Sequence, residues 1–105
     1  MTEAGIPTVD VSDVPSPIPD GVLVLDVRED NEWQAGHIDG ATHIPLGDLP
    51  ARVGELDPTV PTLVVCHLGG RSARATQWLQ AQGLDATNVA GGMEAWEQAG
   101  RPIVA

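Results

Sequence analysis

The segment VVCHLGGRS, residues 64–72, decides how this chain folds. Its first residues belong to a short apolar run that begins at Thr62, which is typical of a strand buried on both faces. From Ser72 to Gln82 apolar side chains recur at spacings of three and four, and Gly83 follows as a helix stop. The segment therefore predicts a buried strand joined to a helix by a glycine-rich loop that begins at Cys66.

The rest of the chain repeats this alternation of short apolar runs and helix-like stretches. We expect strands at residues 8–11, 22–26, 42–44, 62–65 and 86–89, helices at 30–34, 46–56, 72–82 and 93–98, and a tail at 102–105. Strands separated by helices form right-handed crossovers, so the pattern predicts an α/β fold with a parallel sheet. Chemistry in such folds gathers beyond the carboxyl ends of the strands, where Asp26, Arg28 and Cys66 are expected.

Length and charge limit the classes of protein and partner. A chain of 105 residues predicts one domain spanning residues 1–105, with its core at about residues 9–99. The formal net charge of −10 argues against nucleic acid and against anionic membrane surfaces, because both would repel the protein. The first residues lack a targeting pattern and the longest apolar run is only Val22–Leu25, so we expect a cytoplasmic protein with no membrane partner.

Cys66 is the single cysteine, which excludes an intramolecular disulfide and a resolving thiol. The three histidines do not have the spacing of zinc ligands, so we expect no metal site. A free cysteine often packs as an inert small apolar side chain, and this is the alternative to a reactive Cys66. The glycines that follow favour the reactive residue, because an inert core cysteine gains nothing from a turn that costs backbone entropy.

The loop after Cys66 combines three features that stabilise negative charge. Gly69 and Gly70 allow successive N–H groups to turn inward, the following helix contributes its N-terminal partial charge, and Arg71 adds a guanidinium. No Asp or Glu occurs between Pro58 and Leu84, so this segment is locally positive within an acidic chain. We therefore expect a lowered pKa for Cys66 and a cradle that holds a small anion against its sulfur.

Four segments resemble, in the same order, the signatures of the rhodanese homology domain. They are DVRE at residues 26–29, GHIDGA at 36–41 with the Ile-Pro at 44–45, CHLGGR at 66–71 and GGMEAW at 91–96. His43 and Trp33 differ from the residues that are common in the family at their positions. The resemblance covers residues 9–96 and implies a three-layer α/β/α domain with a five-stranded, mainly parallel sheet in the strand order 3-2-4-5-1.

Loop length distinguishes two chemistries in this family of folds. Four residues separate Cys66 from Arg71, whereas the related phosphatases have one more. The shorter loop resembles that of the sulfurtransferases, which implies that Cys66 takes sulfane sulfur from thiosulfate or a persulfide and passes it to a thiol or cyanide. The implied partners are a small anionic sulfur donor, an external thiol or cyanide acceptor, and a protein donor or acceptor; no cofactor is implied.

The resemblance and the loop chemistry together assign the site. Cys66 is the expected nucleophile and Arg71 the residue that binds the anionic part of the donor, and the rest of the substrate site is formed by His67, Leu68, Gly69, Gly70 and Ser72. Asp26 and Arg28 are candidates for a supporting role beside the loop. A buried ion pair, Arg28 with Asp26 or Glu32, is the favoured interpretation of these two residues. Trp33, Trp78 and Trp96 are expected in the core.

Two rival classes of function remain open from the sequence. The first is a phosphatase or an arsenate-reducing relative with the same type of cysteine cradle, which the loop length disfavours. The second is a non-enzymatic interaction or sulfur-carrier module. Inactive members of the family usually lack the cysteine, so the presence of Cys66 weighs against this second class.

Overall fold

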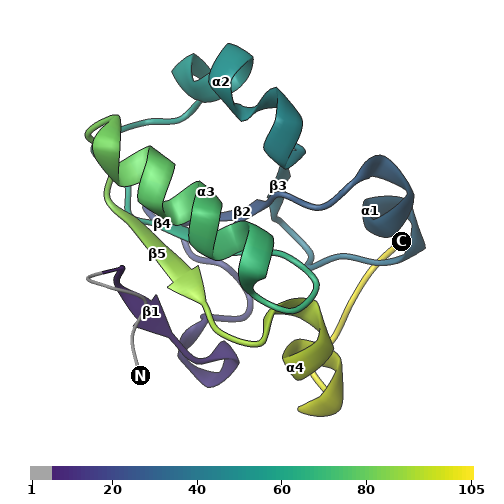
Figure 1. Cartoon of the computed structure of the whole chain (residues 1–105). Helices are drawn as coiled ribbons and strands as arrows, with labels where there is room; N and C mark the ends of the chain where they lie inside the picture. The colour runs from purple at the N-terminus through teal and green to yellow at the C-terminus, as the bar shows by residue number, and fades with distance from the viewer. Residues whose placement is uncertain (1–5) are drawn as a thin grey trace.

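The computed structural model describes residues 6–105 and is built around a five-stranded sheet (Figure 1). The strands are β1 (Thr8–Val9), β2 (Leu23–Asp26), β3 (Thr42–His43), β4 (Thr62–Val65) and β5 (Ala86–Val89). They lie in the order β1-β5-β4-β2-β3, and every pairing between them is parallel. Viewed from the opposite edge this is the order 3-2-4-5-1, so the predicted fold class and strand order are confirmed.

Helices cover both faces of the sheet and form the outer layers. They are α1 (Asp30–Ala35), α2 (Leu49–Arg52), α3 (Gly70–Ala81) and α4 (Gly92–Gln98), with short 3-10 helices η1 (Val11–Asp13), η2 (Leu46–Asp48) and η3 (Val53–Glu55). Side chains of α2 and α3 pack on one face of the sheet in one cluster, and those of η1 and α4 pack on the other face in a second. Adjacent Val64 and Val65 belong to different clusters, because successive strand side chains point to opposite faces.

The first strand is shorter than predicted. Strand β1 ends at Val9, and the predicted continuation to Val11 is wrong because the chain turns there into η1. Asp10 caps this helix: its carboxylate accepts from the Ser12 N–H at 3.4 Å, while its own N–H donates to the Asp13 carboxylate at 3.0 Å. The capping residue, rather than the β-branched side chains beside it, sets the backbone here.

The C-terminal segment is not the free tail that the sequence predicted. His37 and Val104 form an antiparallel bridge, in which the N–H of each donates to the carbonyl oxygen of the other at 2.8 Å. The indole N–H of Trp96 donates to the Pro102 carbonyl oxygen at 2.9 Å. The segment thus connects the residues that follow α1 to the end of the chain. It does so through hydrogen bonds to the backbone, which leave no pattern in the sequence.

The three tryptophans have different environments. Trp96 is 1% exposed, in the core cluster on the α4 side of the sheet. Trp78 is partly buried against the other cluster, on the α3 side. Trp33 is half-buried and its ring stacks on His37 and on His43, with ring centroids 3.5 and 4.7 Å apart, so its placement in the core was wrong. Within residues 6–105, no helix is both long enough and apolar enough to cross a membrane.

Candidate active site

Cys66 follows β4 directly and is 1% exposed, at the carboxyl edge of the sheet where the sequence placed it. Its Sγ accepts a hydrogen bond from the Gly69 N–H at 3.0 Å and one from the Ser72 hydroxyl at 3.3 Å. The Ser72 hydroxyl also lies 3.2 Å from the Gly69 carbonyl oxygen, and its single proton can favour only one acceptor at a time. A thiolate is the stronger acceptor, so ionisation of Cys66 draws this proton towards Sγ.

The loop lowers the pKa of the Cys66 thiol. Burial raises this pKa, but hydrogen bonds from the Ser72 hydroxyl and from the backbone N–H groups of Ser72, Gly69 and Leu68 together outweigh the burial. The direction agrees with the expectation from the sequence. Of the two loop glycines, Gly69 has the left-handed conformation, with φ 113°, whereas Gly70 is the first residue of α3 with no positive φ. The inward turn of the N–H groups therefore depends on Gly69.

Helix α4 supports the Cys66 loop through hydrogen bonds between backbone groups. The Met93 N–H donates to the Cys66 carbonyl oxygen at 2.8 Å, and the Glu94 N–H donates to the His67 carbonyl oxygen at 3.0 Å. A Cβ atom at Gly92 would lie 2.2 Å from the Cys66 carbonyl oxygen, so no other residue fits there without displacing the loop. The GGMEAW segment therefore serves the candidate site by anchoring the backbone that presents Cys66.

Arg71 forms an ion pair with Glu32. The sequence did not predict this pair, because Arg71 lies in a segment without acidic residues. Its Nη1 and Nη2 atoms donate to the two carboxylate oxygens of Glu32 on α1 at 2.6 and 2.8 Å. This contact lowers the pKa of Glu32 to about 2 and raises that of Arg71. Because the pKa of Glu32 is depressed on folding, its stabilising contribution is present above about pH 4.5 and is lost as the pH falls towards 2.

Asp26 and Arg28 form the buried ion pair that the sequence favoured, and the partner is Asp26 rather than Glu32. Arg28 is 5% exposed and Asp26 is fully buried, with Nη2 of the arginine 2.8 Å from the carboxylate. The same Nη2 donates to the Gly36 carbonyl oxygen at 2.7 Å. Arg28 thereby fixes the end of α1, the helix that carries Glu32 to Arg71, so its observed contact with the candidate site is indirect.

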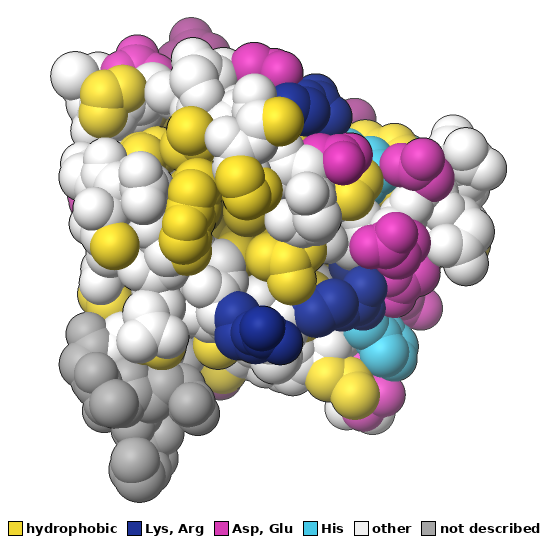
Figure 2. Space-filling view, turned by 45° about the horizontal axis from the view of Figure 1, so that its top comes forward, with side chains coloured by type: hydrophobic (Ala, Val, Ile, Leu, Met, Phe, Trp, Pro, Cys, Tyr) yellow, Lys and Arg dark blue, Asp and Glu magenta, His cyan; other side chains and the backbone are white. Residues whose placement is uncertain are grey.

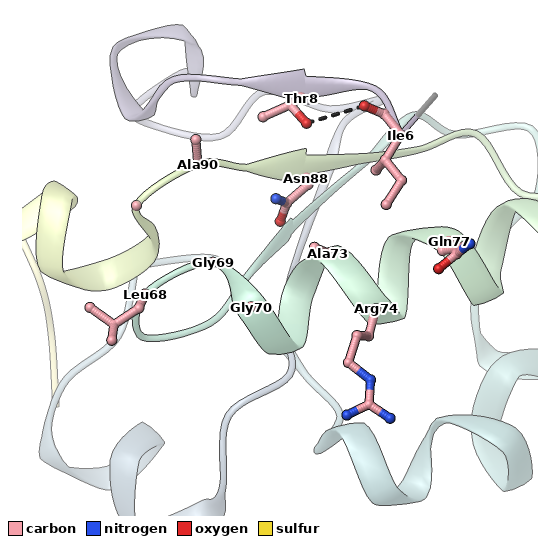
Figure 3. Close-up of a pocket in the computed structure, with 11 residues that line it drawn as sticks. Ile6, Thr8, Leu68, Gly69, Gly70, Ala73, Arg74, Gln77, Asn88 and Ala90 are labelled. Carbon is pink, nitrogen blue, oxygen red and sulfur yellow. Dashed lines mark hydrogen bonds between the residues drawn. The ribbon is translucent and has the colours of Figure 1, made fainter. Parts of the chain in front are cut away.

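His67 and Leu68 are exposed residues of the Cys66 loop, and the surface that they form is the mouth of the loop. The His67 side chain is 49% exposed and approaches Glu94 at 3.8 Å, and Leu68 is 60% exposed. A cavity of about 430 Å³ lies between α3 and strands β5 and β1 and is bounded by Leu68, Gly69 and Gly70. Figure 3 shows the Asn88 side chain directed into it, whereas Cys66 is not among its lining residues. The cavity therefore borders the Cys66 loop without including the cysteine itself.

No group of three or more His, Cys, Asp or Glu side chains among residues 6–105 is arranged to hold a metal ion. The donors around Cys66 instead form a cradle of N–H and O–H groups about one sulfur atom. Such a cradle stabilises an anionic sulfur and can hold a second sulfur attached to it.

Replacing Ser72 with Ala is expected to raise the pKa of Cys66, because a hydrogen bond that favours the thiolate is removed. The measurement is the rate of alkylation by iodoacetamide as a function of pH, which follows the thiolate fraction. Ser12→Ala, an exposed serine in η1, is the matched control and should leave the profile unchanged. An unshifted profile in Ser72→Ala would show that the hydroxyl does not act on the sulfur.

Sequence reasoning identified the loop but missed the residues that support it from elsewhere. Glu32 appeared only as a possible partner for Arg28, and no role was assigned to the N–H groups of Met93 and Glu94. The pattern Glu29-x-x-Glu32 at the start of a short helix was the available signal for Glu32, because it forms a capping box that fixes this carboxylate.

Comparisons with known proteins agree with this geometry. The Shewanella oneidensis protein named thiosulfate sulfurtransferase GlpE is 38% identical over 79 residues, which are 74% of this chain and 78% of that one. Bacillus subtilis YtwF is 40% identical over 81 residues, 77% of this chain and 79% of that one. A rhodanese-related protein from Thermoplasma volcanium superposes with a TM-score of 0.87 at 33% identity, covering 93% of this chain and 97% of that one. The family model of the rhodanese-like domain matches residues 10–99, and the chain belongs to this family.

Proposed function

We propose that this protein is a sulfurtransferase that carries sulfane sulfur as a persulfide on Cys66. The observation that carries the proposal is the cradle around Sγ, with the Gly69 N–H at 3.0 Å and the Ser72 hydroxyl at 3.3 Å. Only four residues lie between Cys66 and Arg71, which favours one sulfur atom over a phosphate group. Membership of the rhodanese-like family and relatives named thiosulfate sulfurtransferase support a role in sulfur transfer.

The reaction has two steps, each a displacement at sulfur. In the first, the Cys66 thiolate attacks the outer sulfur of thiosulfate, an S–S bond forms on Sγ, and sulfite leaves with the electron pair of the broken bond. In the second, a thiolate or cyanide attacks the outer sulfur of the persulfide and releases the Cys66 thiolate. Loop N–H groups stabilise the anion at both stages. Since the chain has one cysteine, the acceptor must be an external molecule.

The roles of the loop residues follow from this scheme. Cys66 is the nucleophile, the N–H groups of Leu68, Gly69 and Ser72 stabilise the sulfur anion, and His67 and Leu68 form the mouth where donor and acceptor enter. The donor and the acceptor are small molecules or a sulfur-bearing protein segment, because His67 and Leu68 give the loop an exposed surface.

Incubation with thiosulfate is expected to add one sulfur atom to the mass of the protein, and Cys66→Ser is expected to abolish the adduct, because serine cannot form a persulfide. Intact-mass spectrometry before and after addition of cyanide gives the measurement, and cyanide should remove the added mass. An adduct that persists in Cys66→Ser would overturn the proposal.

The same preparation tests the phosphatase class of function. Hydrolysis of an aryl phosphate by the wild-type protein, without a thiosulfate adduct, would assign the cradle to phosphate chemistry instead. Thiosulfate turnover without aryl phosphate hydrolysis is the expected result.

A further inference from the structure

The contact between Glu32 and Arg71 links the Cys66 loop to α1. Two parallel hydrogen bonds of 2.6 and 2.8 Å join the guanidinium to the carboxylate across 39 residues of sequence. Such a paired geometry restricts both side chains and is stronger than a single charged hydrogen bond. Arg71 is therefore held in one orientation beside the loop, with two of its donors occupied.

Glu32 is itself fixed by the fold. Its Oε1 also accepts from the Glu29 N–H at 3.0 Å, which closes the capping box of α1. The end of the same helix is held by Arg28 through the Gly36 carbonyl oxygen at 2.7 Å. Glu32 is thus anchored independently of Arg71 and does not need the arginine to hold its position.

The carboxylate also offsets the charge of Arg71 throughout the ordinary pH range. Glu32 remains ionised down to a pH of about 2, its pKa, because of the bond to Arg71. Its side chain is 27% exposed and that of Arg71 is 34% exposed, so the pair lies at the surface rather than in the core. Figure 2 shows basic side chains on this face lying beside a row of acidic side chains. The positive charge that Arg71 gives to this segment of the sequence is therefore offset by Glu32 in the folded protein.

We infer that Glu32 determines donor specificity: by holding and neutralising Arg71 it makes the Cys66 site favour neutral or singly charged persulfides over dianionic thiosulfate. This inference rests on the proposed function and refines it. Thiosulfate must bring two negative charges to a thiolate, and an arginine already bound to a carboxylate offers it little compensation. A hydropersulfide brings less charge: the Cys66 thiolate attacks its outer sulfur, the persulfide forms, and the donor's own thiolate leaves.

The test compares wild type with Glu32→Gln, which keeps the size of the side chain and removes its charge. With thiosulfate, the variant is expected to gain about tenfold in kcat/KM, mainly through a lower KM, because the charge of Arg71 is no longer offset by a carboxylate. With the hydropersulfide of 2-mercaptoethanol, kcat/KM is expected to stay within about twofold, because that donor gains little from the freed charge. Glu32→Asp, which retains the charge, should keep the wild-type preference for the hydropersulfide over thiosulfate.

A second readout does not depend on sulfur transfer. Iodoacetate and iodoacetamide are similar in size but differ by one negative charge, and the ratio of their rates with Cys66 cancels any change in its thiolate fraction. Glu32→Gln is expected to raise the iodoacetate to iodoacetamide ratio by about threefold. The matched control is Asp30→Asn on the same helix, since Asp30 is 79% exposed and approaches His43 rather than Arg71. This control should leave the ratio unchanged.

The outcomes separate the inference from the proposed function. If Glu32→Gln leaves the alkylation ratio unchanged, or lowers thiosulfate turnover, Glu32 is not a specificity residue and the inference is overturned. If wild type forms no persulfide with any donor, the proposed function fails, and the alkylation ratio still decides whether Glu32 controls access of anions to Cys66. An equal gain with both sulfur donors would also contradict a selection by charge.

Discussion

Replacing Arg28 with Met is expected to lower the free energy of unfolding by about 3–5 kcal/mol. The variant is less stable because the fully buried Asp26 carboxylate loses the Arg28 guanidinium, which lies 2.8 Å away in the wild-type protein. Removing one member of a buried pair costs more than the pair itself contributes, because the remaining charge has neither water nor a counter-charge. The substitution also frees the Gly36 carbonyl oxygen and with it the end of α1.

Urea denaturation of the variant measures this effect, and two comparisons isolate its cause. In the double variant Asp26→Leu with Arg28→Met, much of the lost stability should return, because two apolar side chains replace the two charges. Arg52→Met breaks the exposed ion pair with Glu55 and should change the midpoint little. A single variant as stable as wild type would show that the buried pair does not hold β2 and α1 together.

Replacing Gly92 with Ala is expected to destabilise the protein by roughly 2–5 kcal/mol and to impair Cys66 chemistry at the same time. The backbone of Gly92 has φ 52°, and the added Cβ would lie 2.2 Å from the Cys66 carbonyl oxygen and 2.7 Å from that of His67. Both are backbone atoms that cannot rotate away, so the loop or α4 must move. That movement weakens the bond from the Met93 N–H to the Cys66 carbonyl oxygen, which is 2.8 Å long in the wild-type protein.

A glycine elsewhere in the chain separates the clash from the conformational cost. Gly100 has φ 73°, but a Cβ atom added there would meet no other group within 4 Å, so Gly100→Ala carries only the cost of the left-handed backbone. Unfolding measurements and iodoacetamide rates on both variants are the test. Gly92→Ala should lose stability and alter Cys66 reactivity, whereas Gly100→Ala should lose less stability and keep wild-type reactivity. Equal behaviour of the two would mean that α4 does not support the loop.

These contacts explain how a small domain can hold the Cys66 sulfur in a defined position. The loop is tied to α4 through two carbonyl oxygens, to α1 through Arg71, and to its own helix through the Ser72 hydroxyl. Each tie fixes donors before any substrate arrives, and preorganised donors stabilise a sulfur anion without reorganising as it forms. A separate apolar groove between α2 and α3 is lined by Leu49 and Trp78 among others, and Cys66 is not part of its lining.

Local patterns in the sequence placed all five strands and the loop at the candidate site, but β1 is shorter than predicted and residues 46–56 form η2, α2 and η3 rather than one continuous helix. Strands β4 and β5 have the predicted bounds, because a short apolar run that ends in a cysteine or a glycine turn is a local signal. Helix α3 begins two residues before the predicted Ser72, since Gly69 in the left-handed conformation sets its start. The loop of Cys66, Gly69 and Ser72 also follows from neighbouring residues, and the structure brings these three together.

What only the tertiary structure decided is how this loop is supported and how its charge is balanced. Glu32 and Arg71 are 39 residues apart, and the N–H groups of α4 reach Cys66 from beyond β5. The bridge between His37 and Val104 joins segments that are still further apart. Hydrogen bonds and ion pairs of this kind depend on three-dimensional distance and leave no periodicity in the chain. The sequence therefore predicted Cys66 as the residue that carries the chemistry, and the packing of distant segments determined the electrostatic environment of its sulfur.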